Sequence, residues 1–317
     1  MKLFLRLLFF TSFFFTYPLF SQSVGTTSFE FLKMQYSARG AAMGSNLVAV
    51  KGDVNAMFYN PASLASITDR QYTVNYVDHL LDFQGGQLAY SHPTQRFGKL
   101  SVGLIYFSYG DFDETNEFGE KTGRSFSASE FAMAVSIANA LGEGFDYGLN
   151  VKFIYSSLES YNASAIAFDG GLIYTIQQLE NLQLGFSVSN LGFTLDNYTD
   201  TKEKMPLYLR FGFAKRLAHL PLLFTGSLND LSLETGDFWD RIRRFSIGGE
   251  FDVSEIIKLR LGYDNDVNQS VKPIGGRNFG GINGGLGIIW KKFRLDYAYS
   301  AYGDLGSQNR LGVTGYF

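Results

Sequence analysis

The segment Phe145-Asp146-Tyr147-Gly148-Leu149-Asn150-Val151-Lys152-Phe153 carries an apolar or aromatic side chain at every odd position and a polar residue or glycine at every even one. Successive side chains of a β-strand point to opposite faces, so the segment predicts a strand with one apolar and one polar face. The same alternation recurs at residues 184–189, 207–214, 259–264 and 293–300. The chain is therefore predicted to be all-β.

A soluble sandwich and a membrane barrel both give this alternation, and the strand lengths favour the barrel. The predicted strands are about 9 to 15 residues long, whereas strands of soluble proteins typically have about 5 to 6 and tilted membrane strands need about 9 to 11. The polar faces carry Gly, Ser, Asn, Arg and Asp, which suits a polar lumen. We therefore expect a transmembrane antiparallel β-barrel.

Counting back from the C-terminus predicts about fourteen strands, an even number as bacterial barrels require. They lie near residues 70–79, 83–92, 98–109, 126–139, 145–156, 164–176, 182–192, 205–214, 219–229, 242–253, 256–264, 279–291, 293–301 and 308–317.

The connections between these strands alternate in length. Short turns are predicted near residues 93–97, 141–144, 177–181, 215–218, 254–255 and 291–292, and longer loops at 110–125, 193–204, 230–241 and 265–278. The loop after residue 79 is a short exception, and the loop at 110–125 is acidic. Short periplasmic turns and long external loops are the outer-membrane pattern, so the first strand is expected to begin, and the last strand to end, in the periplasm.

The N-terminal region is predicted to direct export. Lys2 and Arg6 precede an apolar run from Leu7 to Phe15, and Ser21 lies just before the expected cleavage site. Residues 1–21 are therefore predicted to be a secretory signal peptide. The run is too short for a membrane anchor. The chain has no cysteine, which excludes disulfides and thiolate chemistry, and its net charge of −3 argues against a nucleic-acid partner.

Residues 22–69 lack the strand pattern and are rich in small residues, glycine among them, that allow close backbone approach. Asn60 precedes Pro61 and is therefore expected to be extended or in a turn. We expect this segment to fill the lumen as a hatch, or plug, followed by the barrel at residues 70–317.

The run Ala38 to Gly44, followed by residues 53–55 and 59–64, resembles the N-terminal signature of the PorV/PorQ family. That family lies within the barrels similar to the long-chain fatty acid transporter, which share an Asn-Pro-Ala hatch element. Residues 158–161, 215–221 and 248–251 look more like the PorQ branch than the PorV branch.

The resemblance implies a fourteen-stranded barrel with a hatch in the outer membrane of a Bacteroidota-type bacterium. It further implies a role with the type IX secretion system, which exports proteins and attaches many of them to the cell surface. Outer-membrane lipid and other secretion components or cargo proteins are then the expected partners.

Carried onto this chain, the hatch element is Asn60, Pro61 and Ala62, and Arg39 and Gly44 are its supporting positions. These residues either bind a partner or only pack the hatch. The final Phe317 shares a face with apolar residues of the last strand, and resembles the terminal aromatic read by the bacterial barrel-assembly machinery.

Two further functions stay open. A transporter for hydrophobic small molecules, such as long-chain fatty acids, would place its ligand in an apolar pocket against Phe29, Phe31, Leu32 and Met34. The apolar run Ile105, Phe107 and Tyr109 on an inward phase favours such a pocket. An open porin is disfavoured, because residues 22–69 are expected to occlude the pore.

No motif for covalent chemistry is found. The sequence has neither a Gly-x-Ser-x-Gly elbow nor a P-loop lysine in a strand-to-helix context. His79, His92 and His219 lack the spacing of metal ligands. The chain is therefore predicted to be a non-enzymatic binding protein without a metal or cofactor.

Overall fold

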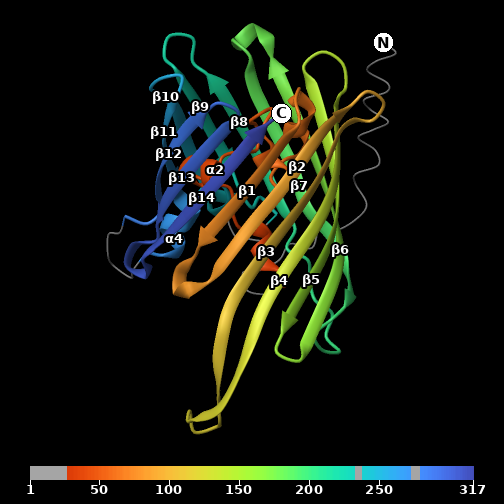
Figure 1. Ribbon diagram of the computed structural model, residues 1–317, viewed down its shortest axis with the longest axis vertical. Coiled ribbons are helices and arrows are strands. Elements are labelled where there is room, and N and C mark those ends of the chain that lie inside the picture. The colour runs from red at the N-terminus through yellow and green to blue at the C-terminus, as the bar shows by residue number, and fades with distance from the viewer. Residues whose placement is uncertain (1–26, 233–237, 273–278) are drawn as a thin grey trace.

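Fourteen antiparallel strands close into a barrel in the computed structural model, which describes residues 27–232, 238–272 and 279–317 (Figure 1). Each strand pairs with its neighbours in sequence, and β1 (Gln71–Asp78) closes the ring against β14 (Ser307–Tyr316). Within the described ranges, no helix has the length and apolar character that a membrane span requires. The predicted signal peptide, residues 1–21, lies outside the described residues.

The remaining strands are β2 (Gln84–Thr94), β3 (Gly98–Thr115), β4 (Lys121–Ala140), β5 (Phe145–Leu158), β6 (Tyr161–Ile176), β7 (Leu182–Asp196), β8 (Tyr208–Arg216), β9 (Leu222–Leu228), β10 (Phe245–Asp252), β11 (Ile257–Asp264), β12 (Ile282–Trp290) and β13 (Phe293–Ala301). The helical turns are η1 (Glu30–Lys33), α2 (Ala38–Ala42), η2 (Val54–Ala56), η3 (Pro61–Ser66), η4 (Leu80–Asp82), η5 (Gln177–Leu179), α3 (Phe238–Ile242), α4 (Asn265–Ser270) and η6 (Gly303–Leu305).

The predicted fourteen-stranded barrel is confirmed, and most strand boundaries fall within three residues of the prediction. The predicted loop at 110–125 is wrong, because β3 and β4 continue as a long hairpin that leaves only residues 116–120 as the turn. The predicted loop at 193–204 likewise begins late, since β7 runs to Asp196. Short helices α3 and α4 occupy parts of the next two predicted loops, where the sequence signalled none.

The connections sort by length, although less completely than predicted. One end of the barrel carries turns of two to five residues, such as 291–292 and 177–181. We call this the short-turn end. The other end, called the loop end, carries the three long connections at 197–207, 229–244 and 265–281. Its hairpins β5–β6 and β13–β14 nevertheless turn tightly, because strand pairing continues to their tips.

Burial along the strands is inverted relative to a soluble protein. On β5 the apolar Leu149, Val151 and Phe153 are 53%, 51% and 42% exposed, whereas the intervening Asn150 and Lys152 are 1% and 2% exposed. Each of the other strands likewise carries at least one exposed large apolar or aromatic side chain. A continuous outward apolar belt and a polar interior are the properties of a barrel surrounded by lipid.

The wall is taller on one side. Strands β3 to β7 have 14 to 20 residues, whereas β8 to β14 have 7 to 10, and Figure 1 shows the β3–β4 hairpin extending far past the rest. A bulge between Ser108 and Asp111, with Gly110 at φ 72°, shifts which residues of β3 face inward. Beyond it, Asp111 and Asp113 are exposed and polar, so the apolar belt ends there.

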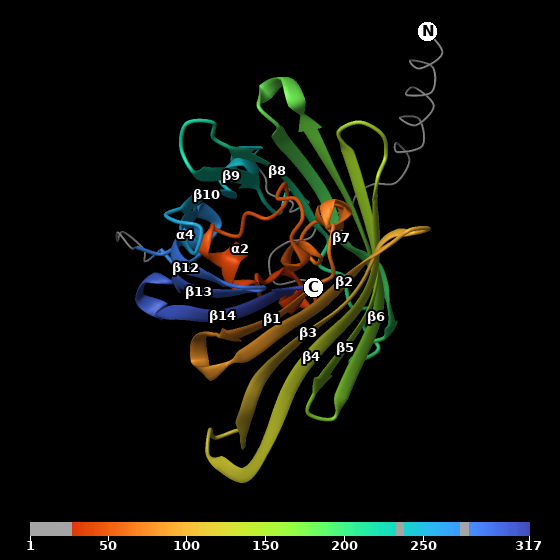
Figure 2. The same ribbon diagram turned by 45° about the horizontal axis from the view of Figure 1, so that its top comes forward.

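Residues 27–69 lie inside the ring of strands (Figure 2). The segment begins at the loop end, where the Ser28 amide donates to the Lys204 carbonyl at 3.0 Å. It reaches the short-turn end, where Lys51 pairs with Asp146 at 2.5 Å. Near that end Asn55 accepts hydrogen bonds from Thr73 and Asn75 of β1 and donates to Thr314 of β14. Asn55 therefore bridges the seam between the first and last strands.

Glycines in the wall let the segment approach the strand backbone directly. A Cβ on Gly171 would lie 1.9 Å from the Asn60 Oδ1 atom, and one on Gly262 would lie 2.1 Å from the Gly44 amide nitrogen. Both distances are far below van der Waals contact, so neither position accepts a side chain in this arrangement. The glycines on the inward faces of the strands thus serve close packing.

Candidate functional site

Two cavities open toward the opposite ends of the lumen. The larger, about 580 Å³, lies toward the loop end and is called the outer cavity. The second, about 550 Å³, lies at the short-turn end between Arg39, Lys51 and Arg216. The lining of the outer cavity includes Ala41 and that of the second includes Arg39, so the two faces of α2 look into different cavities. No described residue lines both cavities.

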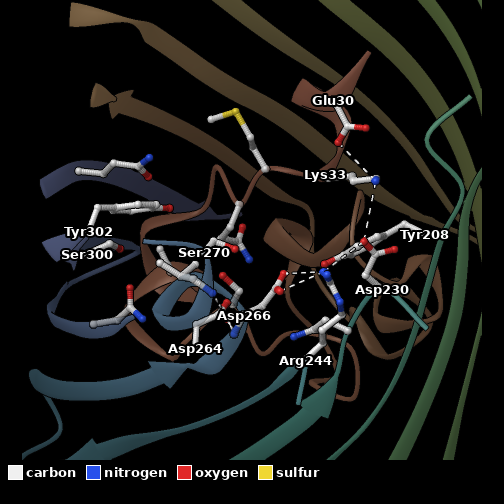
Figure 3. Close-up of a pocket in the computed structure, with 18 of the residues that line it drawn as sticks. Glu30, Lys33, Tyr208, Asp230, Arg244, Asp264, Asp266, Ser270, Ser300 and Tyr302 are labelled. Atoms are coloured by element: carbon white, nitrogen blue, oxygen red, sulfur yellow. Dashed lines mark hydrogen bonds and ion pairs between the residues drawn. The ribbon is translucent and has the colours of Figure 1, made fainter. Parts of the chain in front are cut away.

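The outer cavity has an acidic side made by the connections 229–244 and 265–281 and the end of β11 (Figure 3). Asp264 ends β11 and caps α4, where its Oδ1 atom accepts hydrogen bonds from the amides of Asp266 and Val267. Arg244 lies between Asp266, at 2.9 Å, and Asp230, at 3.7 Å. Among the described residues Asp264 forms no ion pair, so a buried carboxylate faces the cavity without a cation.

The N-terminal segment supplies the neighbouring wall. Lys33 lies 3.3 Å from Glu30 and 3.9 Å from Asp230, which links η1 to the loop after β9. Figure 3 shows these side chains converging on the same space as Tyr208 and Arg244. Burial raises the pKa of Asp266, and the Arg244 guanidinium opposes that change. In the described part of the chain, Lys33 and Arg244 are thus the two cations that hold the acidic side.

A buried arginine, Arg310, lines the outer cavity, and a second, Arg210, packs against two of the tyrosines that line it. Arg310 donates to the Gln35 carbonyl at 2.8 Å and to the Ser300 hydroxyl at 3.0 Å. Arg210 lies between the rings of Tyr59 and Tyr208, 4.2 and 3.9 Å from their centroids. In the described ranges neither guanidinium pairs with a carboxylate.

The cavity therefore presents separated opposite charges and unsatisfied donors. The Gln35 side chain lines the cavity, and its buried Nε2 atom has no hydrogen-bond partner among the residues that the structure describes. Burial raises the pKa of Tyr302, while Arg310 lowers it and Asp264 raises it, so both charges act on one hydroxyl. Unpaired buried polar groups of this kind are costly unless a ligand or water satisfies them.

Below the cavity, six buried charges of alternating sign form a closed network that joins the N-terminal segment to three strands. We call it the charge ring, and its members are Arg39, Glu250, Arg260, Asp296, Arg294 and Asp53.

The contacts around the charge ring are short. Arg39 contacts Glu250 through both Nε and Nη2, at 2.8 and 2.7 Å, and Asp53 through Nη1 at 2.5 Å. The successive ion pairs from Glu250 onward measure 2.6, 2.8, 2.8 and 3.4 Å. The Arg260–Asp296 contact is an ion pair without hydrogen-bond geometry, since Arg260 Nη1 satisfies only the distance.

The charge ring fixes the protonation of its members in the segment. Burial alone would raise the pKa of Asp53, but Arg294 and Arg39 together hold it well below its usual range. Burial would lower the pKa of Arg39, and Glu250 and Asp53 raise it instead. Three cations and three anions make the ring neutral, so it does not repel either class of ion on its own.

The predicted hatch element lies against the wall between β5 and β7. The Asn60 amide donates to the Val48 carbonyl at 2.6 Å and to the carbonyls of Leu172 and Phe186, and its Oδ1 atom accepts from the Ala62 amide. Pro61 occupies the first turn of η3, where its missing N–H costs nothing. Asn60, Pro61 and Ala62 are all buried, as are Arg39 and Gly44 apart from a small exposed part of Arg39.

The residues predicted for an apolar pocket lie in or against one apolar cluster. Phe29, Phe31 and Leu32 are buried among apolar side chains that include Ile105 and Phe107 of β3. Met34 packs at the edge of this cluster and also lines the polar outer cavity. The C-terminal Phe317 stacks on Tyr72 at 5.2 Å and is 64% exposed.

Sequence reasoning did not single out the charge ring or the outer cavity. Arg260, Arg294 and Asp296 fall on the polar phase of their strands, so the alternation placed them inward without showing that they meet. Glu250 lies on the inward phase of its strand, directly after Gly248 and Gly249. This pattern could have indicated a buried charge. Asp230 and Asp266 lie in irregular connections, where no period assigns a direction.

A family model described as type IX secretion system protein PorV matches residues 19–176, just under half of the 317-residue chain. The matched region contains the N-terminal segment and strands β1 to β6. No curated protein sequence matches the chain significantly.

Several solved structures share the fold. The toluene transporter TodX of Pseudomonas putida is 14% identical with a TM-score of 0.60, covering 89% of this chain and 98% of that chain. The toluene transporter TbuX of Ralstonia pickettii is 13% identical with a TM-score of 0.57, covering 88% and 97%. A Pseudomonas aeruginosa FadL homologue is 12% identical with a TM-score of 0.55, covering 89% and 98%. At these identities the likeness shows the fold alone.

Proposed function

We propose that this chain is a non-enzymatic outer-membrane barrel that assists type IX secretion or surface attachment by binding a protein partner at its loop end. The observation that carries the proposal is the PorV family match over the N-terminal segment and the first six strands. The outward apolar belt supports a location in the outer membrane, reached through the predicted signal peptide.

The geometry of the lumen supports binding over conduction. The N-terminal segment crosses from the loop end to the short-turn end and is held by the charge ring and by Asn60. In this proposal it acts as a fixed plug, with the hatch residues Arg39, Gly44, Asn60, Pro61 and Ala62 as packing rather than contact residues. A buried network with this many partners is costly to open, since removing one partner strands another charge.

The outer cavity gives the partner a place to bind. It opens toward the long loops and offers the carboxyl group of Asp264 and the guanidinium group of Arg310, neither of which forms an ion pair among the described residues. A partner side chain or chain terminus that supplies the missing charge would gain charge-assisted hydrogen bonds. A purely apolar ligand would leave both groups without a counter-charge, so the cavity favours a polar partner group.

Deletion and complementation in the source organism test this proposal. We expect loss of surface-attached cargo in the deletion strain, and copurification of a secretion component or cargo protein with the wild-type barrel. A double substitution, Asp264→Asn with Arg310→Gln, should reduce copurification while the barrel still assembles. Normal surface attachment in the deletion strain would contradict the proposal.

A hydrophobic-molecule transporter is the second candidate, favoured by the apolar cluster around Phe29, Phe31 and Leu32. In that case the ligand replaces part of the contacts that bury these side chains. Uptake of radiolabelled toluene or a long-chain fatty acid by cells with and without the gene separates the candidates. Equal uptake together with lost surface attachment would favour the secretion role.

A further inference from the structure

A third cavity lies at the loop end beside the outer cavity and differs from it in chemical character. It measures about 350 Å³ and lies on the inner face of the tall wall, against β3, β4 and β5. It adjoins the outer cavity, since Thr27 and Glu30 line both. We call it the aromatic pocket, and its principal side chains are Phe29, Tyr109, Phe112, Tyr198, Glu30 and Glu130.

Aromatic rings make most of the wall of this pocket. Phe29 and Tyr198 stack with centroids 6.5 Å apart, so the N-terminal segment and the loop after β7 close one side together. Tyr109 and Phe112 line the other side and both pack on Phe83, at 5.3 and 6.4 Å. The bulge at Gly110 produces this arrangement, because it turns Phe112 to the same face as Tyr109.

The rings continue outward as a row. Phe112 stacks on Phe126 at 5.4 Å, and both side chains are partly exposed on the extension of the β3–β4 hairpin. In the other direction Tyr109 meets the buried Phe107 at 4.8 Å. The row thus leads from the exposed hairpin to the interior, and a molecule with an apolar body can follow it from solvent to the pocket.

Glu130 lies at the floor of the pocket and is only 6% exposed. Its Oε2 atom accepts a hydrogen bond from the Tyr109 hydroxyl at 2.6 Å. Within the described ranges it forms no ion pair, and no Lys, Arg or His lines the pocket. The second carboxylate, Glu30, has Lys33 as a partner outside the lining. A buried carboxylate of this kind either takes up a proton or pairs with a cation that a ligand supplies.

We propose that the aromatic pocket binds an organic ammonium ion, with the amine against Glu130 and the apolar body against Phe29, Phe112 and Tyr198. Aromatic faces attract cations within about 6 Å of the ring centroid, and the attraction grows when water is excluded. A neutral hydrocarbon would contact the rings but would leave Glu130 without a counter-charge. The combination of rings and an unpaired carboxylate therefore selects for positive charge rather than for hydrophobicity alone.

Titration calorimetry on the purified full-length barrel in a nonionic detergent tests the proposal. The probe is phenethylammonium chloride, and its neutral analogue is 2-phenylethanol. We expect the ammonium ion to bind about ten- to hundredfold more tightly than the alcohol, because a hydrogen bond to a charged group adds about 1.5–3 kcal/mol. Equal affinities for the two probes, or no binding of the ammonium ion, would overturn the proposal.

Two variants and one control locate the site. Glu130→Gln keeps the shape of the side chain and should abolish the preference for the ammonium ion. Phe112→Leu removes a ring that contacts the apolar body, so it should weaken the binding of both probes and leave the preference for the ammonium ion in place. Asp111→Asn, an exposed carboxylate on the opposite face of β3, should behave as wild type. Each protein must first show the heat-modifiable gel mobility of a folded barrel.

The three variants distinguish binding at Glu130 from binding elsewhere on the barrel. If Glu130→Gln retains the preference for the ammonium ion, the cation binds elsewhere and the assignment is wrong. If Asp111→Asn loses the preference together with Glu130→Gln, the effect is general surface charge and the assignment is also wrong. Loss in Glu130→Gln alone, with the alcohol unaffected, supports it.

Discussion

The two halves of the barrel wall hold the same N-terminal segment with a different balance of apolar and ionic contacts. From β2 to β6 the apolar inward side chains are mainly alanine, with Ile105, Phe107 and Ile154, and they pack on apolar residues of the segment. Buried polar contacts lie among them, including the hydrogen bond from Asn150 to the Met57 carbonyl and the Lys51–Asp146 pair. From β10 to β13 the segment meets the charge ring. Apolar contact is non-directional, whereas the ring needs every partner in place. We therefore infer that β10 to β13, the ionic half, constrain the position of the segment most strongly, and that β2 to β6, the mainly apolar half, fill the remaining space.

Breaking the charge ring should have the largest effect. Glu250→Gln removes the carboxylate that holds both Arg39 and Arg260, so two buried guanidinium groups lose a partner. We expect the barrel to lose about 3–5 kcal/mol of stability. The measurement is the temperature at which the folded gel mobility is lost.

A matched control separates this from a general charge effect. Glu180→Gln removes an exposed carboxylate that pairs with Lys215 at the short-turn end, and it should leave the transition temperature unchanged. Equal shifts in the two variants would show that the ring does not set the position of the segment.

Displacing the N-terminal segment from the wall should have the second-largest effect. Gly171→Ala places a methyl group 1.9 Å from Asn60 Oδ1, and overpacking of this kind costs about 1–3 kcal/mol. The neighbouring Gly170→Ala is the control, since its methyl group meets nothing closer than 3.9 Å. Planar-bilayer conductance and thermal stability are measured together. A rise in conductance for Gly171→Ala alone would mean that the segment obstructs the lumen, and identical behaviour of both variants would contradict the close contact.

Acid should weaken the ionic half before the apolar half. The folded pKa of Asp53 lies below the unfolded value of about 3.9, so its stabilisation is complete above that value and is lost as the pH falls through the folded pKa. We expect the transition temperature of the wild-type barrel to decrease as the pH is lowered below about 4. Asp53→Asn should have a lower transition temperature at neutral pH, and that temperature should change less than in wild type as the pH is lowered. A wild-type acid slope in Asp53→Asn would assign the loss to other carboxylates.

The smallest expected effect comes from the apolar half. Ile154→Val deletes one buried methyl group and should cost about 0.5–1.5 kcal/mol, with the acid slope of wild type. Ile288→Val makes the same change at an outward position that is 40% exposed, and it should be closer to neutral. A larger cost at Ile288 than at Ile154 would mean that the lipid-facing surface, and not the interior cluster, limits stability.

The sequence predicted the barrel well because lipid and lumen impose a strict period of two. The strands β13 and β5 begin where the alternation begins, at Phe293 and Phe145. The prediction ended β3 too early, because the bulge at Gly110 changes the phase and the acidic residues beyond it look like a loop. The strand continues past the bulge, but the alternation of residues alone cannot distinguish a bulge from the end of a strand.

The site was harder to predict because it depends on contacts between distant segments. Asn60, Pro61 and Ala62 were singled out from a local motif, and their partners Gly171, Leu172 and Phe186 carry no signal that names them. The charge ring joins residues as far apart as Arg39 and Glu250, and Asp53 and Arg294. Alternation fixes which way a side chain points, whereas the partner it meets follows from the position of the segment.

The bridge that Asn55 makes across the seam has a consequence for how the molecule is made. Thr73 and Asn75 of β1 and Thr314 of β14 all contact Asn55 only when the segment is in place and the two strands are paired. In lipid, an unclosed sheet leaves two edges of backbone groups without partners, so closure is strongly driven once the edges come together. Asn55 therefore couples the placement of the segment to the closure of the sheet, so a substitution there would disturb the seam and the segment together.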